Sequence, residues 1–277
     1  MHKEAISSGS ARRWGPLFGS GAKVWADTWE GPQGWGGPAY HHVMTGAAIG
    51  DGTRVLDCGC GAGRFTRLAA DAGADVAGID AASEMIEIAA ARTPTGEFIV
   101  GDLEALPWGD DTFDVVTGFS TFQFTDDKVR ALIEARRVAR RTVAVVIPTR
   151  VAESGITLVM AALLPLFSAS ALDSLKRSGI NALSEPGKLD DALASAGLLV
   201  LDDVEIECPS VFDAPESAIR AFLGAGPVTL ARQYAGETAV AEALHEAVRQ
   251  FTGLDERVTL RHWFRVVLAG PSASSPA

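Results

Sequence analysis

The stretch Val55–Phe65, "VLDCGCGAGRF", decides the fold of this chain. A short apolar run leads to Asp57, and three glycines alternate with other residues directly after it. A Gly-rich turn between a strand and a helix lets the backbone approach a ligand closely, and the helix that follows offers unpaired N–H groups. The stretch therefore predicts a strand, a ligand-binding turn and a helix that begins near Gly63.

Strand-like and helix-like segments alternate from Thr53 onward, and several strand segments are unbroken apolar runs. Such runs are typical of a parallel sheet that is buried on both faces. We expect an α/β fold, a doubly wound, mostly parallel seven-stranded Rossmann-like sheet with a helical cap. The expected strands lie at 53–58, 74–80, 97–102, 112–120, 142–148, 199–213 and 258–270, and the clearest expected helices at 63–73, 83–92, 126–140 and 188–198.

The chain divides into parts of different composition. Four of its six tryptophans, Trp14, Trp25, Trp29 and Trp35, lie among glycines near the N-terminus, which disfavours a long helix. This segment is expected to be irregular, either a flap over a ligand or a plain wrap over the core. The expected organisation is an aromatic, Gly-rich flap at 1–45, a Rossmann-like core at 46–150, helical cap segments at 151–185 and 213–252, the remaining core at 186–212 and 253–270, and a disordered tail at 271–277.

Charge and composition exclude several classes of partner. The formal net charge is −11, and an acidic surface repels phosphate backbones, so we expect no nucleic acid partner. The longest apolar run, Ile156–Phe167, has 12 residues and contains Pro165, which is too short to span a bilayer. The N-terminus lacks an apolar leader, and the three cysteines fit a reducing cytoplasm. One C-x-C, Cys58 and Cys60, without a second pair predicts no metal site.

Three acids each end an expected strand of the core. Because the carboxyl ends of parallel strands meet at one edge of a sheet, Asp57, Asp80 and Asp102 are expected to lie together where ligands of such sheets bind. Asp80 can accept both hydroxyls of a ribose, and Asp102 an exocyclic adenine amine. Asp57 beside the turn disfavours a pyrophosphate and favours a cationic amino group. A dinucleotide fingerprint would also need glycine at Arg64, so an NAD(P) enzyme is disfavoured.

These stretches resemble the class I S-adenosylmethionine-dependent methyltransferases, and most closely the small-molecule type of the ubiquinone/menaquinone and biotin pathways. The resemblance rests on "VLDCGCGAGRF", "VAGID", "GDLEALPWGDDTFDVVTGFSTFQF" and "EARRVAR", within Thr53–Pro148. The usual Pro-Gly-Gly turn before the fifth strand is missing. The resemblance implies S-adenosylmethionine as cofactor, S-adenosylhomocysteine as product, and cofactor contacts at Asp57, Gly59, Cys60, Gly61, Gly63, Asp80, Ala81, Met85, Gly101, Asp102, Leu103, Phe119 and Ser120.

The resemblance also predicts a cytoplasmic transferase of small-molecule metabolism. It would methylate a small, apolar or aromatic acceptor mainly by proximity and orientation, because the sulfonium methyl is already activated. His41, His42 and Gln123 are the candidate catalytic residues, whereas His262 lies within an expected strand and is given a structural role. The candidates for the acceptor wall are Tyr40, Met160, Leu164 and Phe167, of which the last three would share one helix face if the helix continues past Pro165.

Two alternatives and several details stay open. The chain could bind S-adenosylmethionine and catalyse a non-methylating reaction such as a cyclisation, or it could be a non-catalytic binding or partner protein. The sequence does not identify the acceptor or its nucleophilic atom, which could be oxygen, nitrogen, carbon or sulfur. A homodimer is possible.

Overall fold

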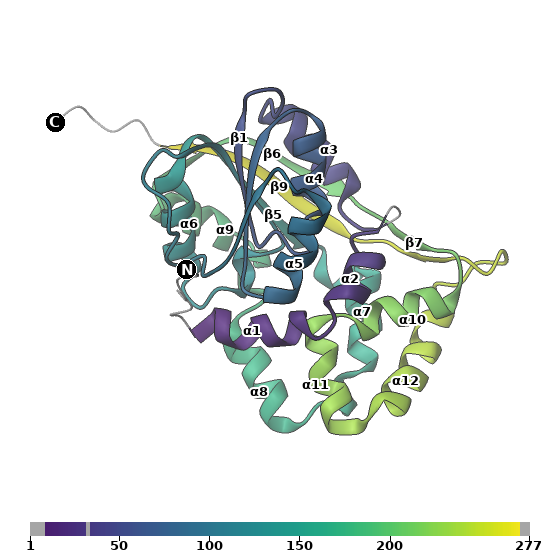
Figure 1. The fold of residues 1–277 in the computed structure, drawn as a ribbon. Helices are drawn as coiled ribbons and strands as arrows, with labels where there is room; N and C mark the ends of the chain where they lie inside the picture. The colour runs from purple at the N-terminus through teal and green to yellow at the C-terminus, as the bar shows by residue number, and fades with distance from the viewer. Residues whose placement is uncertain (1–8, 32–33, 272–277) are drawn as a thin grey trace.

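A computed structural model describes residues 9–31 and 34–271 of the chain. Its centre is a seven-stranded sheet in the order β3-β2-β1-β4-β5-β9-β6 (Figure 1). Only β9 runs against its neighbours, so the predicted mostly parallel Rossmann-like sheet is confirmed. The strands are β1 (Arg54–Cys58), β2 (Asp75–Asp80), β3 (Glu97–Val100), β4 (Phe113–Phe119), β5 (Ala139–Thr149), β6 (Leu198–Glu207) and β9 (Trp263–Pro271).

The central strands are apolar because helices cover both faces of the sheet. Alternate residues of β1 show this: Val55 packs with the helices on one face, and Leu56 with those on the other. The first face carries α3 (Gly37–Gly46) and α4 (Arg64–Asp71), and the second carries α6 (Lys128–Val138) and α9 (Lys188–Ser195). α5 (Ser83–Arg92) packs beside β2 and β3.

The N-terminal segment is helical, which corrects the expectation of irregular structure. It forms α1 (Gly9–Gly19), α2 (Ala22–Asp27) and then α3. Tertiary packing outweighs the poor helix propensity, because the aromatic side chains are buried against distant elements. Trp29, for example, packs edge-on against Phe222. In Figure 1 the purple α1 lies between α5 and the cap.

The cap, defined as α7 (Gly155–Ala162), α8 (Ala169–Ser178), α10 (Pro215–Leu223), α11 (Gly226–Ala235) and α12 (Glu237–Arg249), lies at the lower edge of the sheet in Figure 1. α7 ends at Ala162, and a 3₁₀ turn, Leu164–Leu166, contains Pro165, which lacks the N–H that a longer helix needs. The condition that the helix continues past Pro165 is therefore not met, and Met160, Leu164 and Phe167 do not share one helix face. No helix among the described residues is long and apolar enough to cross a bilayer.

Each of the two long strands expected near the C-terminus is broken in two. The first becomes β6 and β7 (Ser210–Phe212), and the second becomes β8 (Val258–Leu260) and β9. β7 and β8 pair with each other as a separate two-stranded ribbon. The break in the second strand leaves His262 outside any strand, directly before β9. Pro271 ends β9, and the rest of the expected tail, 272–277, lies outside the described residues.

Shorter 3₁₀ turns complete the path of the chain. They lie at Phe122–Phe124 after β4, Val151–Glu153 after β5, Leu164–Leu166 in the cap and Ala182–Ser184 before α9.

Candidate functional site

A cavity of about 620 Å³ lies at the carboxyl edge of the parallel strands. Its walls come from the N-terminal helices, the strand ends, the cap and the start of β9. Four of the predicted catalytic and acceptor residues line it, namely Tyr40, Gln123, Met160 and Leu164. So do twelve of the thirteen predicted cofactor residues: Asp57, Gly59, Cys60, Gly61, Asp80, Ala81, Met85, Gly101, Asp102, Leu103, Phe119 and Ser120.

Two predicted residues belong to the core rather than to the cavity wall. Gly63 is the N-cap of α4 with a positive φ of 83°, and a Cβ there would lie 2.9 Å from the Cβ of Ala89. This glycine therefore allows α4 to pack closely against α5. Phe167 is 5% exposed and packs in the main hydrophobic core under the cap.

The structure does not bring His41 or His42 to the cavity. α3 turns Tyr40 toward the cavity, so the next two residues point elsewhere. His41 is exposed, and the Nε2 atom of His42 lies 2.5 Å from the Oδ2 atom of Asp202 in β6. A catalytic role for either histidine has no support in this geometry.

The glycines of the turn are required by their surroundings. Gly59 and Gly61 have positive φ angles of 64° and 54°. A Cβ at Gly59 would collide with the Thr121 hydroxyl, and one at Gly61 with the Glu30 carboxylate. These two glycines therefore let the turn pack against Thr121 and Glu30, while both glycines line the cavity wall without a side chain of their own.

Asp57 lines the cavity from a buried position, and Asp80 lines it from a half-buried one. The Oδ2 atom of Asp57 accepts a hydrogen bond from Thr66 Oγ1 at 2.8 Å, and its Oδ1 atom accepts one from Thr117 Oγ1 at 2.9 Å. Burial raises the pKa of Asp57 to about 7, against the effect of these two hydrogen bonds.

Asp80 holds the turn itself, a role that the sequence did not reveal. Its Oδ2 atom accepts from the backbone N–H of Gly61 at 3.0 Å, and its Oδ1 atom from that of Ala82 at 2.9 Å. Burial raises the pKa of Asp80 as well. Asp102 accepts from the backbone N–H of Glu104 at 3.0 Å through Oδ1.

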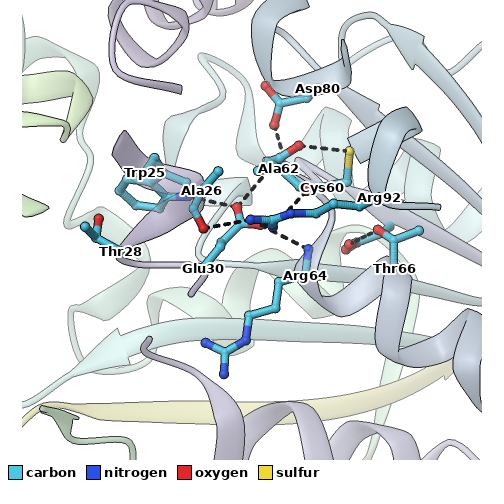
Figure 2. Close-up of polar contacts among 12 residues, drawn as sticks. Trp25, Ala26, Thr28, Glu30, Cys60, Ala62, Arg64, Thr66, Asp80 and Arg92 are labelled. Atoms are coloured by element: carbon cyan, nitrogen blue, oxygen red, sulfur yellow. Dashed lines mark hydrogen bonds and ion pairs between the residues drawn. The ribbon is translucent and has the colours of Figure 1, made fainter. Parts of the chain in front are cut away.

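The buried carboxylate of Glu30, from the N-terminal segment, accepts hydrogen bonds from the same turn (Figure 2). The Oε1 atom of Glu30 accepts from Ala62 N at 2.9 Å and from Trp25 Nε1 at 2.8 Å. Its Oε2 atom accepts from Arg64 N at 3.0 Å and pairs with Arg92 Nη1 at 3.1 Å. A negative charge is favourable at the N-terminus of α4 because the helix dipole is positive there.

We call these five residues, Trp25, Glu30, Ala62, Arg64 and Arg92, the Glu30 clamp. Arg92 extends it by donating to the carbonyls of Ala62 at 3.0 Å and Ala26 at 2.7 Å. Burial raises the pKa of Glu30, against the opposing effects of Ala62 N and Arg92. The clamp could not be predicted from the sequence, since no pattern around Glu30 points to Ala62, Arg64 or Arg92.

Three side chains that line the cavity bury polar atoms for which no described residue provides a hydrogen-bond partner of good geometry. They are Nε1 of Trp14, Oε1 of Gln123 and both ring nitrogens of His262. Unsatisfied buried polar atoms are rare in folded proteins and mark places where a bound molecule can supply the partner.

Tyr40 and Arg64 close one side of the cavity together. The Arg64 guanidinium lies 5.6 Å from the centre of the Tyr40 ring and donates to the carbonyl of Trp35 at 3.1 Å. Burial raises the pKa of Tyr40, so the phenol stays neutral. Among the described residues, no group of three or more histidines, cysteines, aspartates and glutamates could hold a metal ion.

Residues 56–147 match the family model described as a methyltransferase domain. Demethylmenaquinone methyltransferase of Thermotoga maritima is 41% identical over 90 residues, which are 32% of this chain and 39% of that protein. Malonyl-(acyl-carrier protein) O-methyltransferase of Pectobacterium atrosepticum is 36% identical over 89 residues, which are 32% of this chain and 35% of that protein. The matches thus span about two fifths of the curated relatives.

Solved structures share the fold over much more of the chain. A putative methyltransferase of Bacillus halodurans superimposes with a TM-score of 0.56 at 17% identity, over 85% of this chain and 100% of that one. The (4+2)-cyclase SpnF superimposes with a TM-score of 0.58 at 17% identity, over 98% of this chain and 100% of that one. At such identities the likeness shows the fold alone.

Proposed function

We propose that this chain, whose core is a methyltransferase domain of the class I, S-adenosylmethionine-dependent family, transfers a methyl group from S-adenosylmethionine to a small apolar or aromatic acceptor. The predicted family and its cofactor are confirmed by the domain match and the curated relatives. The acceptor is inferred from one observation: the cavity joins an acidic, Gly-rich edge to an apolar wall built by the cap.

The acidic edge fits the cofactor, because the Gly59–Gly61 backbone lines the cavity without side chains, beside Asp57, Asp80 and Asp102. In our proposal Asp57 and this backbone surround the methionine moiety, Asp80 accepts from the ribose hydroxyls, and Asp102 and Leu103 hold the adenine. Ala81, Met85, Gly101, Phe119 and Ser120 complete the surroundings. When bound, S-adenosylmethionine supplies an activated methyl group, which departs from a sulfonium and leaves a neutral thioether.

The opposite wall of the cavity fits an apolar molecule. Its cap side chains and neighbours include Ile156, Met160, Leu164, Leu172, Leu175, Phe222 and Phe264. The N-terminal segment lines the cavity with Trp14, Phe18 and Trp25 of α1 and α2, and with Trp35 of the turn before α3. Such a wall holds an apolar acceptor by burial, at ~25 cal/mol per Å² of apolar surface, and excludes water from the reacting atoms.

The chain's main catalytic contribution is orientation. A site that holds both reactants in line can supply about 7–11 kcal/mol of the barrier in favourable cases. Gln123, in the 3₁₀ turn after β4, lines the cavity with an unpaired carbonyl oxygen and is a candidate for positioning the acceptor.

The test is incubation of the purified protein with S-adenosylmethionine and a metabolite extract from the source organism. Mass spectrometry should detect a product heavier by one methylene group together with an equal amount of S-adenosylhomocysteine. The control is Gly61→Val, in which the added side chain collides with the Glu30 carboxylate and strains the positive φ of the turn. A wild-type protein that binds the cofactor yet releases no S-adenosylhomocysteine with any fraction would overturn the proposal.

The same assay separates the alternative, in which the chain binds S-adenosylmethionine and catalyses a non-methylating reaction. This alternative is retained because the chain shares its fold with SpnF, which is named a cyclase. A rearranged product of unchanged mass, formed without S-adenosylhomocysteine, would support it. The possible homodimer stays a prediction, which analytical ultracentrifugation can test.

A further inference from the structure

His262 reaches the cavity because β9 runs antiparallel to its neighbours. The first residue of β9, Trp263, pairs with Thr149, the last residue of β5. The residue before β9 therefore lies at the edge where the parallel strands end, beside the cap. The backbone at this point is fixed, because the carbonyl of His262 accepts from Cys208 N at 2.9 Å.

The imidazole of His262 is buried, and its ring nitrogens lack well-formed hydrogen bonds within the described part of the chain. The residue is 2% exposed, and neither ring nitrogen has a hydrogen bond of good geometry to another described residue. Phe264 packs edge-on against the ring with the centroids 5.2 Å apart, which holds its orientation. A buried polar group left unpaired is destabilising, so a bound molecule that supplies a hydrogen-bond partner is favoured at this place.

Burial keeps the ring neutral. Burial lowers the pKa of His262 to about 4, and the backbone of Leu260 and the Glu207 carboxylate oppose this shift. Glu207 is itself paired with Arg261, whose Nε and Nη2 atoms lie 2.6 Å and 3.0 Å from its two oxygens. At neutral pH one ring nitrogen therefore carries a free lone pair.

We propose that His262 is the general base of this enzyme and that the acceptor carries a hydroxyl, phenolic or enolic, on an apolar body. The proposal rests on the methyl transfer proposed above. The acceptor oxygen forms a bond to the methyl carbon while the S–CH₃ bond breaks and its electron pair stays on sulfur. The hydroxyl proton passes to the free ring nitrogen of His262 and later leaves to solvent.

Several observations favour a hydroxyl over the other nucleophiles. A carboxylate acceptor needs no base and would enter a cavity that already contains Glu30, Asp57 and Asp80. Of the cations in the lining, Arg64 is engaged with Trp35 and Tyr40, and Lys176 is exposed on α8. An ammonium acceptor would have to be desolvated against the apolar cap. A neutral hydroxyl enters at lower cost, and negative charge that develops on it makes the adjacent imidazole more basic.

The probe is 2-naphthol, an apolar compound with a single hydroxyl group. Single-turnover methylation of 2-naphthol should fall ~10²–10⁴-fold in His262→Gln, which keeps polarity and loses the base. S-adenosylhomocysteine affinity should stay within about twofold, since the residue lies away from the acidic edge. The matched control is His245→Gln, an exposed histidine of α12, which should leave both quantities unchanged.

A second readout does not need turnover. Nitrogen chemical shifts of histidine-labelled protein should show His262 neutral above about pH 5, and its signals should move when 2-naphthol joins the S-adenosylhomocysteine complex. The base is overturned if naphthol is not bound, if it binds without moving these signals, or if His262→Gln methylates it within about threefold of wild type. A wild-type protein that methylates an extract metabolite, with His262→Gln equally fast, overturns the base alone and leaves the methyl transfer standing.

Discussion

Glu30 of the N-terminal segment and Arg92 of α5 form a buried ion pair, with 3.1 Å between the Oε2 and Nη1 atoms. The pair joins two parts of the chain that are 62 residues apart, beside the Gly-rich turn that precedes α4. Because Glu30 also occupies the N-terminus of α4, the N-terminal segment is bound to the very backbone that surrounds the cofactor's methionine moiety in our proposal.

The first prediction concerns this pair. Arg92→Met should lower the free energy of unfolding by about 1–3 kcal/mol, because it leaves the Glu30 carboxylate buried without its cation, while the 28% exposure of the Arg92 side chain moderates the cost. Urea denaturation measures the effect. S-adenosylhomocysteine binding should weaken in parallel, since the turn loses its support.

Lys23→Met is the matched control for Arg92→Met. Lys23 pairs with Asp27 on the surface of α2 at 3.1 Å, with 84% of its side chain exposed, so its loss should cost no more than about 1 kcal/mol. Equal costs for the two variants would show that the Glu30 clamp contributes nothing special.

The second prediction concerns Asp57 and pH. A cationic amino group beside Asp57 favours the carboxylate form, whose pKa in the free protein is about 7. The affinity for S-adenosylmethionine should therefore fall as the pH drops below about 7, by up to about tenfold per pH unit. Calorimetric titration between about pH 5.5 and 8.5 tests this.

The same shift affects stability with a definite sign. The folded-state pKa of Asp57 lies above its ordinary value of 3.8, so its contribution to stability is fully present below that value and is lost as the pH rises through about 7. Asp57→Asn should flatten both pH dependences. An affinity that is pH-independent in the wild-type protein would place the amino group elsewhere.

The sequence predicted the sheet and the acidic edge because both depend on local patterns. Strands that end in Asp57, Asp80 and Asp102 meet at one edge in any right-handed parallel sheet, so their meeting follows from the strand pattern alone. The place of His262 was not predicted, because the strand expected at 258–270 is in fact two strands. The sequence pattern does not show that β8 pairs with β7 whereas β9 pairs with β5. That pairing depends on contacts between distant segments, as does the Glu30 clamp.

The positions of His41 and His42 outside the cavity lining have a related reason. Adjacency to the aromatic flap suggested His41 and His42, but in a helix only one face meets the core, and α3 gives that face to Tyr40. Two positions further along the same helix, His42 therefore faces away from the cavity and pairs with Asp202.

The third prediction concerns Gly61. Gly61→Ala should weaken cofactor binding by about 2–4 kcal/mol, roughly 30- to 1,000-fold, because the positive φ strains an alanine and its Cβ meets the Glu30 carboxylate. Equilibrium binding of S-adenosylhomocysteine measures this. The control is Gly37→Ala in α3, where no described atom lies within 4 Å of the added Cβ. Affinity retained in Gly61→Ala would show that the turn does not contact the ligand.

The last prediction separates the wall of the acceptor site from the core beneath it. Met160 lines the cavity from α7, whereas Phe167 lies in the main hydrophobic core. Met160→Gln should raise the KM for the acceptor by roughly 5- to 100-fold, because a buried amide left unpaired against an apolar ligand costs about 1–3 kcal/mol. The affinity for S-adenosylhomocysteine should change less than about twofold, since that ligand meets the opposite edge.

Phe167→Ala should lower the stability and leave the KM for the acceptor little changed. Loss of a buried phenylalanine leaves a cavity and costs about 3–5 kcal/mol of stability, with KM little changed in the fraction that stays folded. Thermal denaturation and steady-state kinetics on both variants give the comparison. If Met160→Gln instead loses stability as Phe167→Ala does, α7 is a packing helix. The acceptor would then lie under the N-terminal helices, against Trp14 and Trp25, which line the other side of the cavity.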